Sequence, residues 1–292
     1  MNGLLLVDKP TDMTSFGVVA RLRRITGEKC GHSGTLDPLA TGLLPVLVGK
    51  GTKLCELLTA GNKSYRGTVR FGLATDTGDI TGKVLAEQKD FSPSREQILS
   101  ILPQFTGVIT QRPPIYSAIK VGGVPLYRHA RAGKEVEIPT RQIEIFRIEL
   151  ISYDASQREA IFEVDCSKGT YIRSLFMDMA QALGGCGTMT ALRRLRSGAY
   201  DLKDAYPLEA LMEMEGKPLP IIPLEQVVGF LPRYQPIDFF ATLLKNGCEV
   251  SIKKLKGLPE GLCTVWQGET LLGLGEQIEK DGEILFKIVT HL

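Results

Sequence analysis

The sequence predicts an α/β or α+β protein in which a large layered domain precedes a smaller β-rich one. Three observations support this prediction. Stretches of alternating apolar and polar residues are interspersed with stretches of helical spacing over the first two thirds of the chain. Six prolines between residues 207 and 236 mark a connecting region. Beyond them, short apolar runs separated by Gly, Pro and Asp have the pattern of a small barrel.

The N-terminal elements are predicted from apolar spacing and from capping residues. Residues 3–7 are an apolar run that ends at Asp8-Lys9-Pro10, which indicates a strand. Thr14 or Ser15 can cap a helix, because apolar residues follow at helical spacing. Those residues are Val18, Val19, Leu22 and Ile25. A second helix is expected over residues 53–58, ending near Gly61.

Alternation predicts further strands over residues 65–73, 143–151 and 160–166. Ser92-Pro93 is expected to open a helix, and Lys168–Arg173 leads into another that closes at Gly184-Gly185. In the C-terminal part, the apolar runs that suit strands are 263–266, 270–274 and 284–289.

Residues 107–139 differ in kind from the segments around them. They are rich in Pro, Gly and aromatic residues and show no sustained period. A long irregular stretch within a compact domain is usually functional or disordered. Aromatic residues and isoleucines are dense here, which argues against disorder.

The run from Gly31 to Leu44 is the most informative part of the chain, because it sets Asp37 between glycines with Pro38 directly behind it. Proline keeps the residue before it out of the α region, so Asp37 is held extended. One interpretation is a helix cap, with Asp37 at N-cap and Pro38 at N1. The other is a reactive carboxylate, and both can hold, because a cap can aim a carboxylate into a cleft.

Composition excludes several classes of function. The six cysteines and three histidines are scattered without the paired spacing of a zinc site, so no metal is expected. Residues 49–53 resemble a phosphate loop but lack the first glycine that it requires, so no nucleotide cofactor is expected. No apolar run is long enough to span a bilayer and no signal peptide is evident, which predicts a cytoplasmic protein. The net charge of +2 does not by itself establish RNA binding.

Several motifs resemble the TruB family of tRNA pseudouridine-55 synthases. Besides the Asp37 loop, the matching segments are Asp8-Lys9-Pro10 with Thr14-Ser15, Lys63-Ser64-Tyr65, residues 111–120, Lys168–Arg173 and Leu192–Gly198. They run in the family's order from residue 3 to about residue 200. The resemblance implies a pseudouridine synthase fold, with a mixed, largely antiparallel sheet flanked by helices. It also implies a catalytic domain over residues 1–230 and a PUA-like β-barrel domain over residues 231–292.

The resemblance implies the roles of three catalytic residues. Asp37 is expected to be the nucleophile, which must be ionised and oriented. Arg173 is expected beside it, where a guanidinium would keep the carboxylate charged at neutral pH. Tyr65 is expected to stack on the target base and could also help to move a proton. Without the resemblance, a surface arginine and a core tyrosine would be the ordinary interpretations.

Further residues are expected to bind the substrate RNA. By resemblance His32 enters the RNA loop and fills the gap left by an extruded uridine. Residues 107–139 correspond to an insertion that folds over the RNA, where basic side chains would contact phosphates. The substrate-binding residues expected are Lys9, His32, Lys63, Arg112, Lys120, Arg128, Arg131, Tyr171 and Leu192, of which Tyr171 and Leu192 suit core packing nearly as well.

The sequence therefore predicts a cofactor-free isomerase that acts on uridine 55 in the T-loop of tRNA, as a monomer without an obligatory protein partner. Two alternatives remain. A guide-RNA-dependent relative acting on ribosomal RNA shares the Asp37 loop but lacks an insertion like residues 107–139. A noncatalytic tRNA-binding or tRNA-folding protein would not need Asp37, Tyr65 and Arg173 together.

Overall fold

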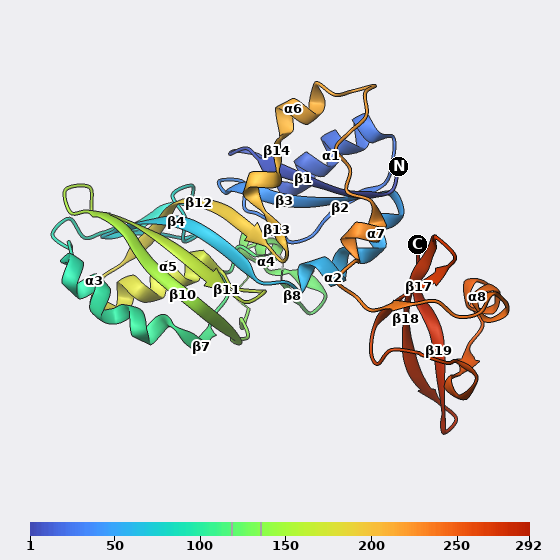
Figure 1. Ribbon diagram of the computed structural model, residues 1–292. Helices are drawn as coiled ribbons and strands as arrows, with labels where there is room; N and C mark the ends of the chain where they lie inside the picture. The colour runs from blue at the N-terminus through green and yellow to red at the C-terminus, as the bar shows by residue number, and fades with distance from the viewer. Residues whose placement is uncertain (118, 135) are drawn as a thin grey trace.

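The computed structural model describes residues 1–117, 119–134 and 136–292, and Figure 1 shows a large unit beside a smaller C-terminal one. A ten-stranded mixed sheet crosses the large unit in the order β14-β1-β3-β12-β4-β11-β10-β7, with β13 on β12 and β2 on β3. The bounds are β1 (Gly3–Lys9), β2 (Cys30–His32), β3 (Thr41–Val48), β4 (Lys63–Phe71), β7 (Gly107–Gln111), β10 (Arg141–Asp154), β11 (Glu159–Cys166), β12 (Gly187–Ser197), β13 (Tyr200–Asp201) and β14 (Tyr206–Pro207).

The pairing of these strands is largely antiparallel. Only β1–β14 and β3–β12 are parallel among the described pairs of this sheet. A short two-stranded sheet, β5 (Leu73–Thr75) with β6 (Val84–Glu87), lies next to β12 in the fold. The predicted class, a mixed and mostly antiparallel sheet flanked by helices, is confirmed.

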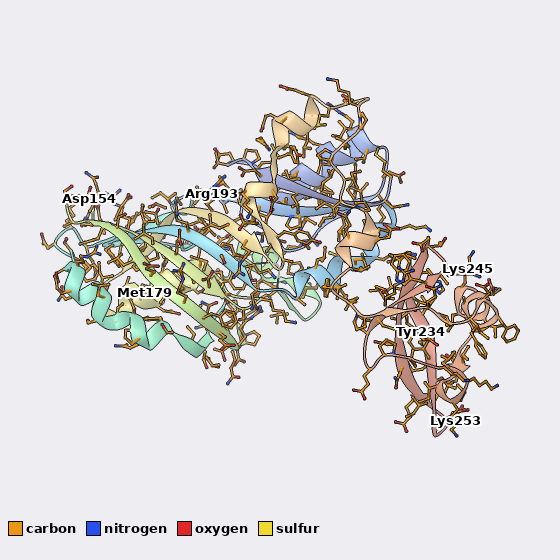
Figure 2. All side chains as sticks on the ribbon, in the orientation of Figure 1. Asp154, Met179, Arg193, Tyr234, Lys245 and Lys253 are labelled. Atoms are coloured by element: carbon orange, nitrogen blue, oxygen red, sulfur yellow. The ribbon has the colours of Figure 1, made fainter. Side chains whose placement is uncertain are left out.

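The three longest helices of the large unit cover one face of the sheet. α1 (Ser15–Thr26) packs on β1 and β3, while α5 (Ile172–Ala182) and α3 (Arg95–Ile101) pack on the other half, where Met179 lies under the strands (Figures 1 and 2). The shorter helices are α2 (Cys55–Thr59), α4 (Leu126–Arg131), α6 (Leu208–Met212) and α7 (Leu224–Val227), with 3-10 turns at Gly49–Leu54, Leu102–Phe105 and Leu202–Asp204.

Several predicted elements are present, with bounds within a few residues of those expected. Thr14 caps α1 by accepting a hydrogen bond from the amide of Gly17, and Gly27 ends the helix at φ 68°. The strands expected over residues 65–73, 143–151 and 160–166 correspond to β4, β10 and β11. The helix expected at residues 53–58 is a 3-10 turn followed by α2, and the one expected at Ser92 begins at Arg95 after a Ser94 cap.

The helix-cap interpretation of Asp37 is wrong, because no helix follows it. The amide of Ala40 donates to the carbonyl of Asp37 at 3.0 Å, closing a turn with Pro38 inside it. The chain then enters β3, where residues 42–48 are all buried. A fully buried strand has a continuous apolar run, which does not distinguish it from a buried helix in the sequence.

Residues 107–139 contain more regular structure than expected. Residues 107–111 form β7, which pairs with β10 at the edge of the sheet. A small hairpin, β8 (Lys120–Val121) with β9 (Val124–Pro125), then leads into α4. The insertion is therefore anchored at its start by the main sheet.

The C-terminal unit holds a five-stranded sheet in the order β15-β17-β18-β19-β16. Its elements are β15 (Arg233–Tyr234), α8 (Asp238–Lys245), β16 (Val250–Ser251), a 3-10 turn (Ile252–Lys254), β17 (Cys263–Gln267), β18 (Thr270–Lys280) and β19 (Glu283–His291). Its own core contains Tyr234, which Figure 2 labels together with Lys245 and Lys253 on its surface. β17, β18 and β19 correspond to the expected strands, whereas β15 and β16 were not expected. Closure into a PUA-like barrel stays a prediction.

The two units share an apolar cluster. Trp266 and Leu271 of the C-terminal sheet pack with Leu4 and Leu6 on the face of β1 opposite α1. At the same junction, Nζ of Lys53 donates to the carbonyl of His291 at 2.6 Å. Among the described residues, no helix has the length and hydropathy needed to cross a membrane.

Candidate active site

A cavity of about 290 Å³ opens where the Asp37 loop meets β4, β12 and the start of α5. This volume lies near the lower end of the roughly 300–1,000 Å³ range of small-molecule sites, which suits one small ring. The residues that line it are 34–37, Thr59, Lys63, Tyr65, Ser117, residues 167–173, Leu192 and Arg194. Asp37 is the one carboxylate among these described lining residues.

The Asp37 loop is bound to the start of α1 and is bounded by glycines with positive φ. The hydroxyl of Ser15 at the start of α1 donates to the carbonyl of Leu36 at 3.0 Å and accepts from the amide of Leu36 at 2.8 Å. Gly34 and Gly42 on either side of the loop have φ of 88° and 97°, as the glycine pattern predicts. The result is a short segment of fixed geometry that presents Asp37 to the cavity.

Arg173 binds Asp37 with two nitrogens. Nε lies 3.0 Å from Oδ2, and Nη2 donates to Oδ1 at 3.2 Å. The arginine side chain is only 4% exposed, whereas that of Asp37 is 34% exposed toward the cavity. A bidentate pair of this kind fixes the direction of the carboxylate as well as its charge.

Three further groups hold Arg173 in place. Nη1 donates to the carbonyl of Thr77 at 2.8 Å, and Nη2 donates to the carbonyl of Tyr116 at 2.9 Å. Asp79 places Oδ2 3.8 Å from Nη1. Because Tyr116 belongs to the 107–139 insertion, the guanidinium connects that insertion directly to Asp37.

Electrostatics at Asp37 differ from the simple expectation. Burial raises the pKa of Asp37, and Arg173 opposes that rise, while Asp79 adds to it. The net direction is upward, so the ion pair reduces the effect of burial instead of overcoming it. Arg173 and Asp79 therefore shift the pKa of Asp37 in opposite directions.

Tyr65 and Leu192 form part of the cavity wall. Tyr65 lies on β4 and is 9% exposed, and Leu192 lies on β12 and is 8% exposed. Burial raises the pKa of Tyr65, while the Arg194 guanidinium beside it acts to lower that pKa. The phenol therefore presents an aromatic surface to the cavity and is biased toward its neutral form.

Tyr171 is half-buried at the N-terminus of α5, where no side chain of the helix itself caps the first turn. Gln111 of β7 holds the backbone of this residue instead: its Oε1 accepts from the amide of Tyr171 at 2.8 Å, and its Nε2 donates to the Tyr171 carbonyl at 3.0 Å. Arg141 lies 5.7 Å from the centre of the tyrosine ring. This contact fixes the residues that precede Arg173.

Two lysines expected to bind RNA are buried. Nζ of Lys9 donates to the carbonyls of Pro10, Met13 and Pro38, at 2.9, 2.5 and 3.1 Å, and the side chain has no exposed surface. Lys63 donates to the carbonyls of Thr59 and Gly61 and is 5% exposed. Burial lowers the pKa of each lysine to about 8. Because Pro38 directly follows Asp37, the bond from Lys9 to the Pro38 carbonyl stabilises the Asp37 turn.

His32 ends β2, is half-buried and lies outside the set of described cavity-lining residues. Its Nδ1 is buried and finds no hydrogen-bond partner among the described residues. Burial lowers the pKa of His32, and Arg194 adds to this effect. The ring is therefore biased toward its neutral form.

The basic residues of the insertion differ from the buried lysines. The side chains of Arg112, Lys120 and Arg128 are exposed. The side chain of Arg131 lies outside the described residues.

Four residues of this site were not expected from the sequence: Asp79, Gln111, Ser117 and Arg194. Asp79 lies 42 positions after Asp37 with no local pattern that marks it. Ser117 lines the cavity with a buried hydroxyl that has no partner among the described residues. Arg194 could have been found, because on a strand it shares a face with Leu192. Among the described residues, no three His, Cys, Asp or Glu side chains are placed to hold a metal ion.

Comparison with known families identifies two matching segments. The model described as TruB family pseudouridylate synthase (N terminal domain) matches residues 23–172. The tRNA pseudouridylate synthase B C-terminal domain matches residues 173–227, so the Asp37 loop and Arg173 fall in consecutive segments.

Curated relatives match over most of the chain. The tRNA pseudouridine synthase B of Clostridium tetani is 40% identical over 295 residues, which covers 100% of both proteins. The protein of that name from Geobacillus thermodenitrificans is 42% identical over 263 residues, 85% of each.

Solved structures share the fold. A chain of a Cbf5-Nop10-Gar1 complex superposes with a TM-score of 0.72 at 26% identity, covering 98% of this chain and 83% of that one. A chain of an H/ACA RNP bound to a substrate RNA containing 2′-deoxyuridine gives 0.71 at 24% identity, over 99% and 84%. The extent of the sequence matches shows that the chain belongs to the TruB family of pseudouridylate synthases.

Proposed function

We propose that this protein isomerises uridine to pseudouridine at position 55 in the T-loop of tRNA. The observation that carries the proposal is the bidentate Asp37–Arg173 pair at a cavity sized for one base, with Tyr65 in its wall. The names of the curated relatives support tRNA as the substrate.

The chemistry needs a nucleophile, a pocket for the detached base and no electron transfer. Asp37 adds to the base or to the ribose, the C1′–N1 bond breaks, and the ring turns before C5 bonds to C1′. The bond to Asp37 breaks again, the C5 hydrogen leaves as a proton and N1 gains a proton, so Asp37 is regenerated and the product is an isomer of the substrate. Arg173 orients the carboxylate, and Tyr65 stacks on the ring, where base–aromatic contacts contribute roughly 1–3 kcal/mol.

A folded T-loop must release its uridine before Asp37 can reach it. In the proposed complex His32 occupies the vacated space in the RNA loop. Tyr171 and Leu192 hold the base, and Lys63 lies in the cavity floor. Lys9 acts through the Asp37 turn, because its three N–H groups are already bound to carbonyls.

The exposed basic side chains of the insertion are proposed to contact phosphates of the tRNA. Arg112, Lys120 and Arg128 suit this role by exposure and charge, and Arg131 is proposed to join them. We propose that the protein acts as a monomer, without an obligatory protein partner, and that it acts in the cytoplasm, where its tRNA substrate is found.

The structural neighbours motivate a second candidate. Cbf5 superposes over nearly the whole chain and is found with Nop10 and Gar1. A guide-dependent activity of this kind would require partner proteins and a guide RNA. The 40% identity to a curated tRNA enzyme over the full length favours the stand-alone enzyme.

The experiment is tritium release from an unmodified tRNA transcript labelled at C5 of its uridines, with wild-type protein and Asp37→Asn. We expect release by the wild type, mapped to the T-loop, and none above background by the variant. Because asparagine keeps the shape of the aspartate side chain, tRNA affinity should stay within a few-fold. Release only after addition of guide RNA and partner proteins would support the second candidate. Absence of release from a wild-type protein that binds tRNA would leave a noncatalytic RNA-binding function.

A further inference from the structure

Arg194 is a buried cation to which the proposed mechanism assigns no role. It lies on β12, is 1% exposed, and is among the largest fully buried side chains of the protein. Its neighbours on the strand are paired with carboxylates although they are far more exposed: Arg193 with Asp8 at 2.6 Å and Arg196 with Asp165 at 3.7 Å. Among the described residues, no carboxylate forms an ion pair with Arg194.

The described hydrogen bonds of Arg194 go to neutral backbone groups. Nε donates to the carbonyl of Leu43 at 2.6 Å, and Nη2 donates to the carbonyl of Gly34 at 3.1 Å. These carbonyls lie at the two ends of the Asp37 loop, so the guanidinium is fixed relative to the nucleophile. They do not neutralise its charge, and burial of an uncompensated charge is costly.

The charge acts on its surroundings. Arg194 contributes to lowering the pKa of Lys63, of Lys9 and of His32. Four cationic side chains line the cavity, Lys63, Lys168, Arg173 and Arg194, against the one carboxylate of Asp37. Since Arg173 already binds that carboxylate with two nitrogens, the cavity retains an excess of positive charge.

The proposed reaction generates an anion in this place. If Asp37 attacks the ribose, the electron pair of the C1′–N1 bond leaves with the base, and uracil becomes an anion. If Asp37 adds to the ring, the electron pair of the broken ring double bond gives an enolate. On either route the ring carries this charge until C5 bonds to C1′, after which C5 loses its hydrogen and N1 gains a proton.

We propose that Arg194 stabilises the negative charge that the uracil ring carries while it is detached or activated in the cavity. This inference rests on the proposed function. A fixed guanidinium suits the role because it is permanently charged and needs no reorganisation when the anion forms. Arg194 lies beside Tyr65 on the neighbouring strand. The tyrosine that stacks on the base and the guanidinium that stabilises the charge of the base therefore come from one pair of strands.

The test measures binding of a free base and not turnover. A T-loop stem-loop RNA with an abasic site in place of the target uridine is bound to the full-length protein. Uracil, which is neutral, and barbiturate, an anionic analogue of similar shape, are then titrated into the complex. For the wild type we expect barbiturate to bind tighter by about tenfold or more.

Three variants separate the charge from its structural bonds. Arg194→Gln should bring the two bases to near-equal affinity, and Arg194→Lys should retain part of the preference because the charge remains. Arg196→Gln, on the exposed part of the same strand, should keep the full preference. Far-UV circular dichroism and urea unfolding establish that each variant is folded.

Two results would overturn the inference. Equal binding of uracil and barbiturate by wild-type protein that releases tritium would reject it while leaving the proposed function intact, and this measurement needs no variant. A loss of stem-loop affinity and of its salt dependence in Arg194→Gln, with the barbiturate preference unchanged, would assign the charge to a phosphate. Absence of tritium release from the wild type would count against the proposed function itself.

Discussion

The protonation of Asp37 depends on opposing contributions from its neighbours. Burial and Asp79 raise its pKa, while Arg173 lowers it through an ion pair and a hydrogen bond. A carboxylate acts as a nucleophile only when ionised, so the balance sets the lowest pH at which the enzyme works.

Arg173→Lys tests this balance. A lysine keeps the charge but loses the two-nitrogen contact with Asp37 and the bonds to the Thr77 and Tyr116 carbonyls. The pKa of Asp37 should then rise further, so the acid limb of kcat/KM moves to higher pH. We expect a loss on the order of tenfold or more at neutral pH, because charge-assisted bidentate bonds are strong.

The measurement is the rate of tritium release across the acidic to neutral range, with the exposed Arg196→Lys of β12 as a control. A lower rate with an unmoved acid limb would mean that Arg173 acts through the backbone carbonyls and not through the charge of Asp37.

Lys9 gives a second prediction at the level of one residue. Its pKa is about 8 in the folded protein against an ordinary 10.5. Between these values the unfolded chain binds more protons than the folded one, so the contribution of Lys9 to stability rises as pH increases from about 8 to about 10.5. Lys9→Met also leaves three carbonyls without their donor. It should therefore lower the free energy of unfolding by more at about pH 9.5 than at about pH 7.

Urea unfolding of wild type and Lys9→Met at both pH values measures the difference, and Lys50→Met on the surface serves as the control. A cost that is independent of pH would show that the folded-state pKa of Lys9 is not lowered.

At the scale of elements, the strands differ in how far their sequence predicts them. In β4 and β11 buried and more exposed residues alternate strictly, because one face packs on α5 and the other carries ion pairs such as Arg66–Glu163. β12 has no such alternation, since arginines occupy both of its faces. The buried Arg194 is stabilised by carbonyls of Leu43 and Gly34, about 150 residues away in sequence, which no local pattern reveals.

The same distinction applies to the site. Asp37, Tyr65 and Arg173 stand in motifs long enough to be matched, so their meeting in one cavity is predictable by resemblance. The upward shift of the Asp37 pKa is not, because it depends on burial and on Asp79, whose approach is set by the tertiary fold.

Substitution of a glycine at the junction of β3 and β12 tests how tightly the residues around the Asp37 loop are packed. Gly42 has φ 97°, and a Cβ there would lie 2.4 Å from the Arg194 carbonyl oxygen. Gly27 also has positive φ, 68°, but a Cβ there meets nothing within 4 Å. Gly27→Ala should cost about 1–2 kcal/mol of unfolding free energy for backbone strain alone. Gly42→Ala should cost about 1–3 kcal/mol more, since overpacking adds to that strain.

Urea unfolding compares the two variants, and tritium release should fall for Gly42→Ala alone, because only this glycine lies beside the nucleophile. An equal decrease in the free energy of unfolding for both variants would show that β3 and β12 can move apart to accommodate the added Cβ without a loss of stability.

At the scale of the whole molecule, the cluster shared by the two units predicts that they unfold together. Trp266, the one tryptophan of the chain, lies in this cluster with Leu4 of β1, while Val265 beside it faces only the C-terminal core. The fluorescence of Trp266 therefore reports on the junction, and far-UV circular dichroism reports on the entire chain. Because the apolar contact is continuous, both signals should follow a single urea transition.

Val265→Ala decides between joint and separate unfolding. It removes methyl groups from the C-terminal core alone, at a cost of about 1–3 kcal/mol. If the units form one cooperative body, the transitions seen by fluorescence and by circular dichroism should both move to lower urea and remain superimposed. A shift in fluorescence alone, with a second transition in circular dichroism, would show that residues 231–292 fold as an independent domain. In that case the boundary expected near residue 230 would mark a unit that can move relative to the cavity.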